Sequence, residues 1–168
     1  HTSGVTPGLS RSCRELMLAL PGRLRASGSN FSFDVNFRPG VWSVEEASPV
    51  LLGLAREADY AFVGRDEAHI LWQTTTPQSV HDLIQPTGRL VVKDGAVGAT
   101  EFSPAGEAFV ASPKVDVVEE IGAGDAFAAG YLSVQLNGGS AVEALQAGHR
   151  LAARTLLSTS DFVPLKRA

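Results

Sequence analysis

Apolar side chains follow two different periods along this chain. In residues 9–26 they recur every three or four positions, which predicts an amphipathic helix, with Ser10 as a candidate N-cap. Residues 31–37 instead alternate apolar and polar side chains, which predicts a strand that stops at Arg38-Pro39-Gly40. Short, nearly continuous apolar runs at 60–63 and 89–93 predict buried parallel strands.

The remaining segments repeat this change of period. Residues 100–102 and 107–111 predict a hairpin around Pro104-Ala105-Gly106. Further helices are expected at residues 45–57, 77–84, 123–137 and 140–158, and a short one is expected to start at residues 66–68. Because strands and helices alternate through most of the chain, we predict an α/β fold in one domain: a doubly wound, mostly parallel sheet with flanking helices.

In such a sheet, ligands bind beyond the carboxyl ends of the strands. Polar residues or glycines follow every predicted strand, and we expect them to gather at one edge. They are Asn36 and Arg38, Gly64 and Glu67, Lys93 to Gly98, and Gly122 to Asp125.

Residues 119–130 combine two carboxylates, a Gly-Ala-Gly turn and a predicted helix with Asp125 in its first turn. The N–H groups of a helix N-terminus can bind an anion, and small residues let it approach. Two interpretations stay open, a phosphate cradle or a tight turn, and Asp125 either complements the helix dipole or accepts a substrate proton. The dinucleotide fingerprint is excluded because Phe127 stands where it needs Gly or Ala, and a P-loop is excluded because this helix lacks a lysine.

The other strand exits also allow two interpretations each. If the strand continues, alternation puts Asp34, Asn36 and Arg38 on one side, where Arg38 could clamp a carboxylate or phosphate. The alternative is a polar sheet face with a salt bridge. Trp42, close after them, is interpreted as a packed core residue.

Glu67 fits either a metal with its water shell or the acidic first turn of a helix. Lys93 with Gly95 and Gly98 fits a nucleotide-phosphate loop or a hairpin-like turn. The histidines show no metal-ligand spacing and are interpreted as surface or packing residues: His69, His81 and His149.

Composition narrows the class of protein. The chain is 44% hydrophobic and 19% charged, as is typical of globular proteins, and its net charge of −4 without a Lys/Arg cluster disfavours nucleic acid. The single Cys13 allows no intrachain disulfide, and no apolar run reaches the roughly 20 residues that span a bilayer. We therefore expect a cytoplasmic protein without nucleic-acid or membrane partners. The chain opens at His1 without an initiator Met, so we expect it to begin mid-fold.

Residues 119–130 and the motifs before them resemble the ribokinase-like (PfkB) carbohydrate kinase family over nearly the whole chain. The motifs occur in the family's order: Asp34 to Arg38 with Trp42, then Gly64 to Glu67, then Val92 to Gly95. The pattern is most similar to the 2-keto-3-deoxygluconate kinase branch, where Asp-x-Asn-x-Arg is followed by a Trp. The resemblance implies that residues 1–168 are the C-terminal, nucleotide-binding part of a ribokinase-like domain, without its N-terminal half and lid.

This resemblance implies ATP-dependent phosphorylation of a sugar or sugar-acid hydroxyl, with Mg²⁺. Asp125 would be the general base, and the amides of Gly122, Ala123 and Gly124 would form an anion hole. Arg38, with Asn36 nearby, would bind the carboxylate of the substrate or approach the phosphates. Glu67 would hold Mg²⁺ through water, and Asp161 would touch the substrate. The nucleotide would lie along Gly64, Lys93, Gly95, Gly98, Gly122, Gly124 and His149.

The chain also departs from the family pattern. Glu119 stands where an Asp is usual, and Glu120-Ile121 replaces the Thr that often follows, which puts a monovalent-cation site in doubt. Gly64 replaces the Asn of the magnesium motif. Without the N-terminal half, we expect this chain to bind nucleotide yet phosphorylate poorly, and we expect any homodimer to form in the full-length protein.

Three alternatives therefore stay open: a non-catalytic nucleotide-binding fragment, a fructokinase- or ribokinase-type enzyme with a neutral sugar, and a dinucleotide-dependent oxidoreductase, which Phe127 weakens.

Overall fold

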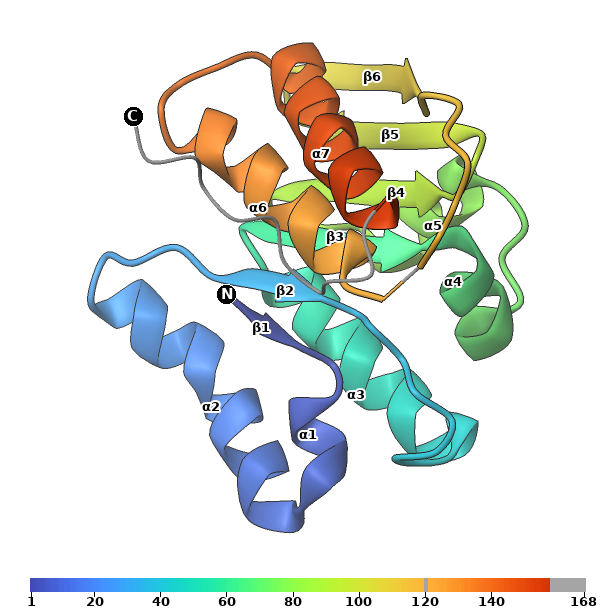
Figure 1. Cartoon of the computed structure of the whole chain (residues 1–168). Coiled ribbons are helices and arrows are strands. Elements are labelled where there is room, and N and C mark those ends of the chain that lie inside the picture. Colours follow the sequence, from blue (N-terminus) through green and yellow to red (C-terminus); the bar gives the residue numbers. More distant parts are fainter. Residues whose placement is uncertain (120, 158–168) are drawn as a thin grey trace, which may run out of the picture. The chain divides into compact units, whose positions relative to one another are not determined.

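The computed structural model of the protein describes residues 1–119 and 121–157 (Figure 1). The chain divides into two compact units. The first unit comprises His1–Asp94 with Glu101–Glu107, and the second comprises Gly95–Thr100 with the chain from Ala108 onward. The six strands follow one another in the sheet in the order of the sequence, β1 to β6.

The first unit contains the parallel part of this sheet. Its strands are β1 (Thr2–Ser3), β2 (Ser32–Asp34), β3 (Tyr60–Gly64) and β4 (Arg89–Asp94), and each pairs in parallel with the next. Helices provide the crossovers that parallel neighbours require. They are α1 (Thr6–Leu9), α2 (Arg11–Ala26), α3 (Val44–Glu57), α4 (Arg65–Trp72) and α5 (Pro77–Ile84). The predicted α/β fold with a mostly parallel sheet is confirmed.

Strands β5 (Gly98–Ser103) and β6 (Gly106–Ala111) are neighbours in the sheet. Only Pro104 and Ala105 join them, and so short a connection can link antiparallel strands only. The predicted hairpin is therefore confirmed, and it makes the sheet mixed.

The helix predicted over residues 9–26 is interrupted at Ser10. The backbone of Ser10 is extended, with φ −165° and ψ 165°, so that α1 ends at Leu9 and α2 begins at Arg11. The Ser10 side chain accepts a hydrogen bond from the backbone N–H of Cys13 at 3.1 Å, as expected of an N-cap. Pro21 lies inside α2, and the helix continues past it to Ala26.

The core of the first unit lies on one face of β2 and β3. Phe33, Val35 and Val63 have no exposed surface, and helix α3 adds Leu51 and Leu54 to the same cluster. Trp42 also belongs to this cluster and is 5% exposed, which confirms its predicted role in the core. The Arg14 guanidinium lies 5.2 Å from the centre of the Trp42 ring, as in a cation–π contact.

Strand β2 is shorter than the alternation of residues 31–37 predicted, and it ends at Asp34. Asn36 has a φ of 33°, in the left-handed region that Asn tolerates better than most residues. Its N–H donates to Asp34 Oδ1 at 3.2 Å, which gives this turn a local hydrogen bond. The expectation that strand alternation places Asp34, Asn36 and Arg38 on one side is therefore wrong beyond Asp34.

In the second unit, α6 (Ala123–Gln135) packs closely against α7 (Ala141–Leu156). Gly130 permits the approach, because a Cβ there would lie 2.5 Å from the backbone oxygen of Ala147. Ser140 and Glu143 cap α7 reciprocally, in a capping box. Both predicted long helices are present, and the predicted end at residue 158 lies outside the described residues.

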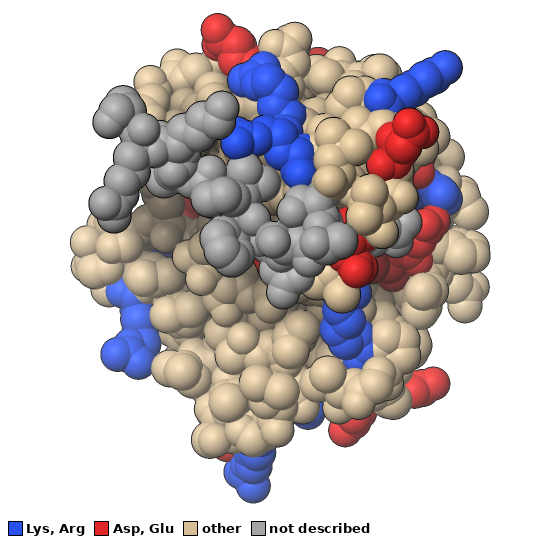
Figure 2. Space-filling model, in the orientation of Figure 1, with Lys and Arg blue, Asp and Glu red and all other residues tan. Residues whose placement is uncertain are grey.

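The described helices include none with the length and apolarity that a bilayer crossing needs. On the face shown in Figure 2, acidic and basic side chains are interspersed among uncharged residues.

Candidate functional site

The carboxyl ends of β2, β3 and β4 bring charged side chains together in the first unit. Asp34 ends β2, Gly64 ends β3, and Lys93 is the residue before the end of β4. Because these strands are parallel, their ends share one edge of the sheet, the edge at which α/β proteins bind ligands. The predicted convergence of strand exits is thus observed within this unit.

An ion pair joins the two outer strands of this group. Lys93 Nζ lies 2.7 Å from Asp34 Oδ2, and Asp34 is only 2% exposed. The other carboxylate oxygen of Asp34 accepts the N–H of Asn36. A buried carboxylate is costly unless it is paired and hydrogen-bonded, and both of these oxygens have a partner.

Glu67 lies in the first turn of α4 and folds back over Gly64. The Gly64 N–H donates to Glu67 Oε2 at 2.9 Å. A Cβ at residue 64 would lie 3.0 Å from that oxygen, so glycine gives the carboxylate its room. Burial raises the pKa of Glu67, and the charge of Asp34 adds to the rise, while Lys93, the Gly64 N–H and Arg38 oppose it. Glu67 therefore shares its electrostatic environment with Asp34, Lys93 and Arg38.

The described residues form no ready-made cluster of metal ligands at this edge. Among residues 1–119 and 121–157, no three His, Cys, Asp or Glu side chains are grouped so that they could hold a metal ion. Mg²⁺ is usually held by one or two carboxylates together with water and substrate phosphates. Glu67 contributes one carboxylate, and its predicted contact with Mg²⁺ through water stays a prediction.

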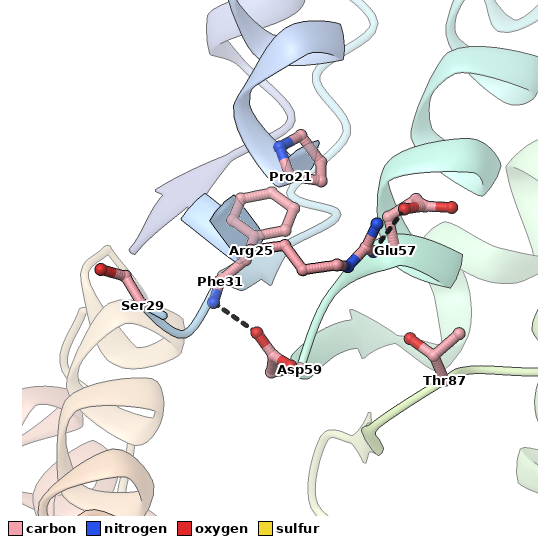
Figure 3. Close-up of a pocket in the computed structure, with 7 residues that line it drawn as sticks. All are labelled: Pro21, Arg25, Ser29, Phe31, Glu57, Asp59 and Thr87. Atoms are coloured by element: carbon pink, nitrogen blue, oxygen red, sulfur yellow. Dashed lines mark hydrogen bonds and ion pairs between the residues drawn. The ribbon is translucent and has the colours of Figure 1, made fainter. Parts of the chain in front are cut away.

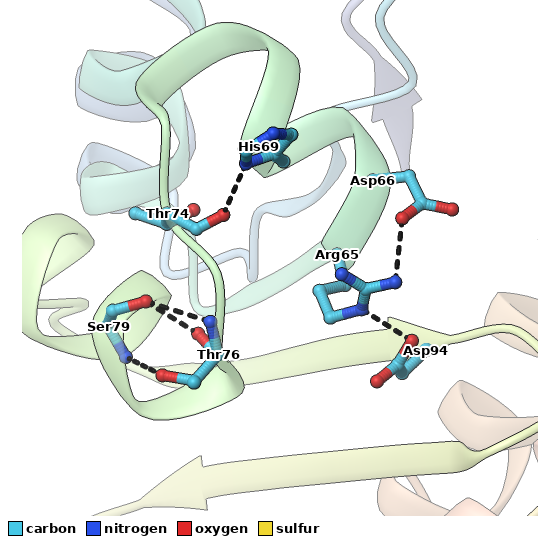
Figure 4. A network of polar contacts seen from close by, with 7 residues as sticks. All are labelled: Arg65, Asp66, His69, Thr74, Thr76, Ser79 and Asp94. Atoms are coloured by element: carbon cyan, nitrogen blue, oxygen red, sulfur yellow. Dashed lines mark hydrogen bonds and ion pairs between the residues drawn. The ribbon is translucent and has the colours of Figure 1, made fainter.

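A second polar network braces the same edge (Figure 4). Arg65, the first residue of α4, contacts Asp94 Oδ1 through Nε at 2.6 Å and Asp66 Oδ1 at 2.8 Å. This contact ties the start of α4 to the end of β4, beside Lys93. Sequence reasoning missed both this pair and the Asp34–Lys93 pair. The open alternative of a polar sheet face with a salt bridge named no partner outside residues 34–38, whereas Asp34 pairs with Lys93 of β4.

In the second unit, a left-handed glycine forms the turn before α6. Gly122 has a φ of 78°, in the region that favours glycine, and no side chain of a described residue caps the helix. The N–H groups of its first turn have no partner within the helix. Asp125 lies in that first turn and is exposed. This geometry suits both a phosphate cradle and a tight turn, the two interpretations of residues 122–125.

Two further residues predicted to bind nucleotide meet at one backbone carbonyl, that of Val110 on β6. A Cβ at Gly98 would lie 2.4 Å from this oxygen, and His149 Nε2 lies 3.0 Å from it. Because a carbonyl only accepts, His149 carries its proton on Nε2 here. Burial lowers the pKa of His149, and the Phe127 ring contacts it edge-on at 5.2 Å. His149 is therefore a packing residue, as predicted.

The candidate residues thus fall into two groups. Asn36, Arg38, Gly64, Glu67 and Lys93 belong to the first unit. The second unit contains Gly95, Gly98, Gly122, Ala123, Gly124, Asp125 and His149. Asp161 and Glu120 lie outside the described residues.

A cavity of about 360 Å³ lies at the opposite edge of the first unit (Figure 3). Its lining residues precede β2, β3 and β4 or come from α2 and α3: Pro21, Arg25, Ser29, Phe31, Glu57, Asp59 and Thr87. The Arg25 guanidinium pairs with Glu57 at 2.8 Å, and Asp59 accepts the N–H of Phe31 at 2.6 Å. Because this cavity lies at the amino ends of the strands, the carboxyl edge is the stronger candidate.

Parallel strands joined by helices, with a hairpin in the same sheet, define an α/β protein with a mixed sheet. Residues 1–166 match the model of the pfkB family carbohydrate kinases, and the chain belongs to that family.

Relatives and solved structures agree with this assignment. The chain is 37% identical to 2-dehydro-3-deoxygluconokinase of Escherichia coli strain K12, over 98% of this chain and 56% of that protein. The Bacillus subtilis protein of the same name is 32% identical, over 96% and 51%. The chain thus spans about half the length of the curated relatives it matches. Since 2-dehydro is the systematic form of 2-keto, the predicted resemblance to that branch is confirmed.

Among solved structures, a PfkB protein from Polaromonas superposes with a TM-score of 0.84 and 35% identity, over 92% of this chain and 52% of that one. Aminoimidazole riboside kinase from Salmonella enterica, solved with aminoimidazole riboside and an ATP analogue, gives a TM-score of 0.80 and 28% identity, over 94% and 56%.

Proposed function

We propose that this chain serves the ATP-dependent phosphorylation of a sugar or sugar-acid hydroxyl, with a 2-keto-3-deoxygluconate-like substrate. The observation that carries the proposal is the turn at Gly122, a left-handed glycine that opens a helix of 13 residues with Asp125 exposed in its first turn. Residues 1–168 would be the C-terminal, nucleotide-binding part of a ribokinase-like domain. The kinase names of the relatives support this reaction class.

The proposed mechanism assigns the chemistry to the start of α6. The Asp125 carboxylate accepts the proton of the substrate hydroxyl as that oxygen attacks, and its exposure leaves it accessible. The N–H groups of Gly122, Ala123 and Gly124 stabilise the negative charge on the transferring group. Bound ATP and Mg²⁺ would supply the phosphoryl group and part of the charge neutralisation that phosphoryl transfer needs.

Residues proposed to contact nucleotide occur in each unit, taken by itself. Lys93 would contact phosphates, and Glu67 would hold Mg²⁺ through water. The other contacts would come from Gly64, Gly95, Gly98, Gly122, Gly124 and His149. For His149, the contact would involve the ring face or the edge away from Nε2, because that nitrogen donates to Val110.

The substrate would be bound by Arg38, with Asn36 nearby. Arg38 is exposed, and its guanidinium has no ion pair or hydrogen bond to the part of the chain that the structure describes. An arginine of this kind can bind a carboxylate bidentately, which supports an acidic sugar over a neutral one. A contact from Asp161, a cytoplasmic location and a dimer of the full-length protein stay predictions.

Asp125→Asn tests the proposed base. In the full-length protein, the variant should lower sugar-dependent ADP release by orders of magnitude, because Asn cannot accept the proton, while ATP affinity is kept. Turnover is followed by a coupled ADP assay and affinity by calorimetry. Asp116→Asn, which changes another exposed aspartate of the same unit, is the matched control and should stay active. Near-normal turnover of Asp125→Asn would overturn the assignment.

A non-catalytic nucleotide-binding role is the second candidate. It is favoured by Glu119 and Gly64, which depart from the family pattern. ATP binding to this chain without sugar-dependent ADP release would support it. Steady ADP release that depends on sugar would rule it out.

A further inference from the structure

The Asp34–Lys93 ion pair reaches across a whole strand. Asp34 ends β2 and Lys93 lies on β4, with β3 between them in the sheet. Lys93 is in register with Gly64, the last residue of β3. Neighbouring strands lie about 4.8 Å apart, so the two backbones are separated by roughly 10 Å. Only a long side chain can bridge that distance, and Gly64 presents no side chain in its way.

This pair fixes the position of a flexible side chain. A lysine side chain has a flexible four-carbon stem and three N–H donors, and a lysine without an ion-pair partner samples many rotamers. Here one donor is directed to Asp34 Oδ2 at 2.7 Å. The Lys93 side chain is 20% exposed, and no second partner is found for Nζ among the described residues. The ammonium is therefore held at the carboxyl edge with donors left for another anion.

The anchor itself is rigid. Asp34 is 3% exposed in its side chain, and its second oxygen accepts the N–H of Asn36, which has a left-handed backbone. Asp34 thus fixes both the lysine and the turn that leads to Arg38. Its own oxygens are occupied and buried, so it has little surface with which to contact a ligand.

We infer that Asp34 is a positioning residue that acts through Lys93, holding the ammonium where nucleotide phosphates bind. The inference rests on the proposed function, in which this edge receives ATP. A donor that is already in place loses less conformational freedom on binding than one that must first be ordered. Removal of Asp34 should therefore weaken recognition of the phosphates and leave recognition of the nucleoside unchanged.

The test compares the affinities for ATP and adenosine, measured by calorimetry on the whole 168-residue chain. The variants are Asp34→Asn, Lys93→Met and the double variant. In Asp34→Asn the affinity for ATP should fall about tenfold, by analogy with the loss of an orienting partner behind a ligand-binding group, and adenosine affinity should not change. In the Lys93→Met background, Asp34→Asn should not change the ratio of ATP affinity to adenosine affinity any further.

Glu57→Gln is the matched control. It neutralises a carboxylate that also pairs with a cation, Arg25, but at the opposite edge of the same unit. Its ratio of ATP to adenosine affinity should equal that of the wild type.

Three outcomes would overturn the inference. Asp34→Asn could bind ATP more tightly, it could lose equal affinity for ATP and adenosine, or it could lower the ATP-to-adenosine ratio as much in the Lys93→Met background as in the wild type. A wild-type chain that binds no ATP would instead contradict the proposed function. If Asp34→Asn does not fold by circular dichroism, Asp34→Glu keeps the charge and moves the anchor by one methylene group. It should lower the ATP-to-adenosine ratio, and an unchanged ratio would overturn the inference.

Discussion

Single side chains at the edge of the sheet already differ in what they can do. Asp34 and Lys93 form an ion pair with each other, and the Glu67 carboxylate accepts a hydrogen bond from the Gly64 N–H. Arg38 extends from the turn after β2 without an ion pair to any described residue. A guanidinium in that state is the group of this edge best suited to recognise a substrate carboxylate.

Arg38→Ala should therefore lower kcat/KM for an acidic sugar by about ten- to a hundredfold, as expected for a lost charge-assisted contact of about 1.4 to 3 kcal/mol, and leave a neutral sugar nearly unaffected. Arg38→Lys should restore only part of the loss, because an ammonium cannot form the bidentate contact. Arg23→Ala, at another exposed arginine in the same unit, is the control. An equal loss for acidic and neutral sugars would contradict the assignment.

His149 gives a prediction on stability and pH. Burial lowers its folded pKa below the ordinary 6.5, so that the unfolded state takes up the proton first as the pH falls. The contribution of His149 to the free energy of unfolding is thus complete above pH 6.5 and is lost progressively below it. Urea unfolding at several pH values should show a weaker decline on acidification for His149→Gln than for the wild type. Parallel pH curves for the two proteins would exclude this coupling.

At the scale of elements, the packing of α6 against α7 depends on a glycine. Gly130 brings the α6 backbone so close to Ala147 that a methyl group would lie 2.5 Å from a carbonyl oxygen, which cannot move without the helix. The start of α6, with Gly122 and Asp125, is positioned by this same helix pair.

Gly130→Ala should consequently lower the free energy of unfolding by about 1–3 kcal/mol, the usual cost of overpacking, although alanine is the better helix former. Gly53→Ala is the matched control. Gly53 is also helical, in α3, but nothing lies within 4 Å of the position that an alanine methyl group would take there, so this variant should gain about 0.5–1 kcal/mol. Chemical denaturation measures both. If Gly130→Ala were neutral or stabilising, the contact between α6 and α7 would accommodate an added methyl group despite the close spacing of the two backbones.

At the scale of the whole molecule, sequence periodicity was sufficient to predict the helices and strands but not the contacts between their side chains. Helix α5 begins and ends where the apolar pattern predicted, at Pro77 and Ile84. The strand exits were recognised because polar residues and glycines follow each buried run. The Asp34–Lys93 pair joins residues 59 positions apart, and such a pairing leaves no period in the sequence.

Local hydrogen bonding to the backbone also limited what the sequence pattern could predict. Alternation predicted a strand through Phe37, but the turn at Asn36 ended it at Asp34, because a side-chain acceptor competed with the sheet. The glycine turn at residues 122–124 was recognisable since its motif is contiguous. The charged cluster of the first unit is built from three strands, so only the fold could assemble it.

Gly64 has a consequence for how this edge can vary in sequence. Its φ of −76° suits any amino acid, so the backbone does not require glycine here. The Asn of the family's magnesium motif would place its Cβ 3.0 Å from Glu67 Oε2, so that this carboxylate would have to move slightly away. The place of the Glu67 carboxylate thus depends on residue 64, three positions upstream, because glycine has no side chain to occupy the same space.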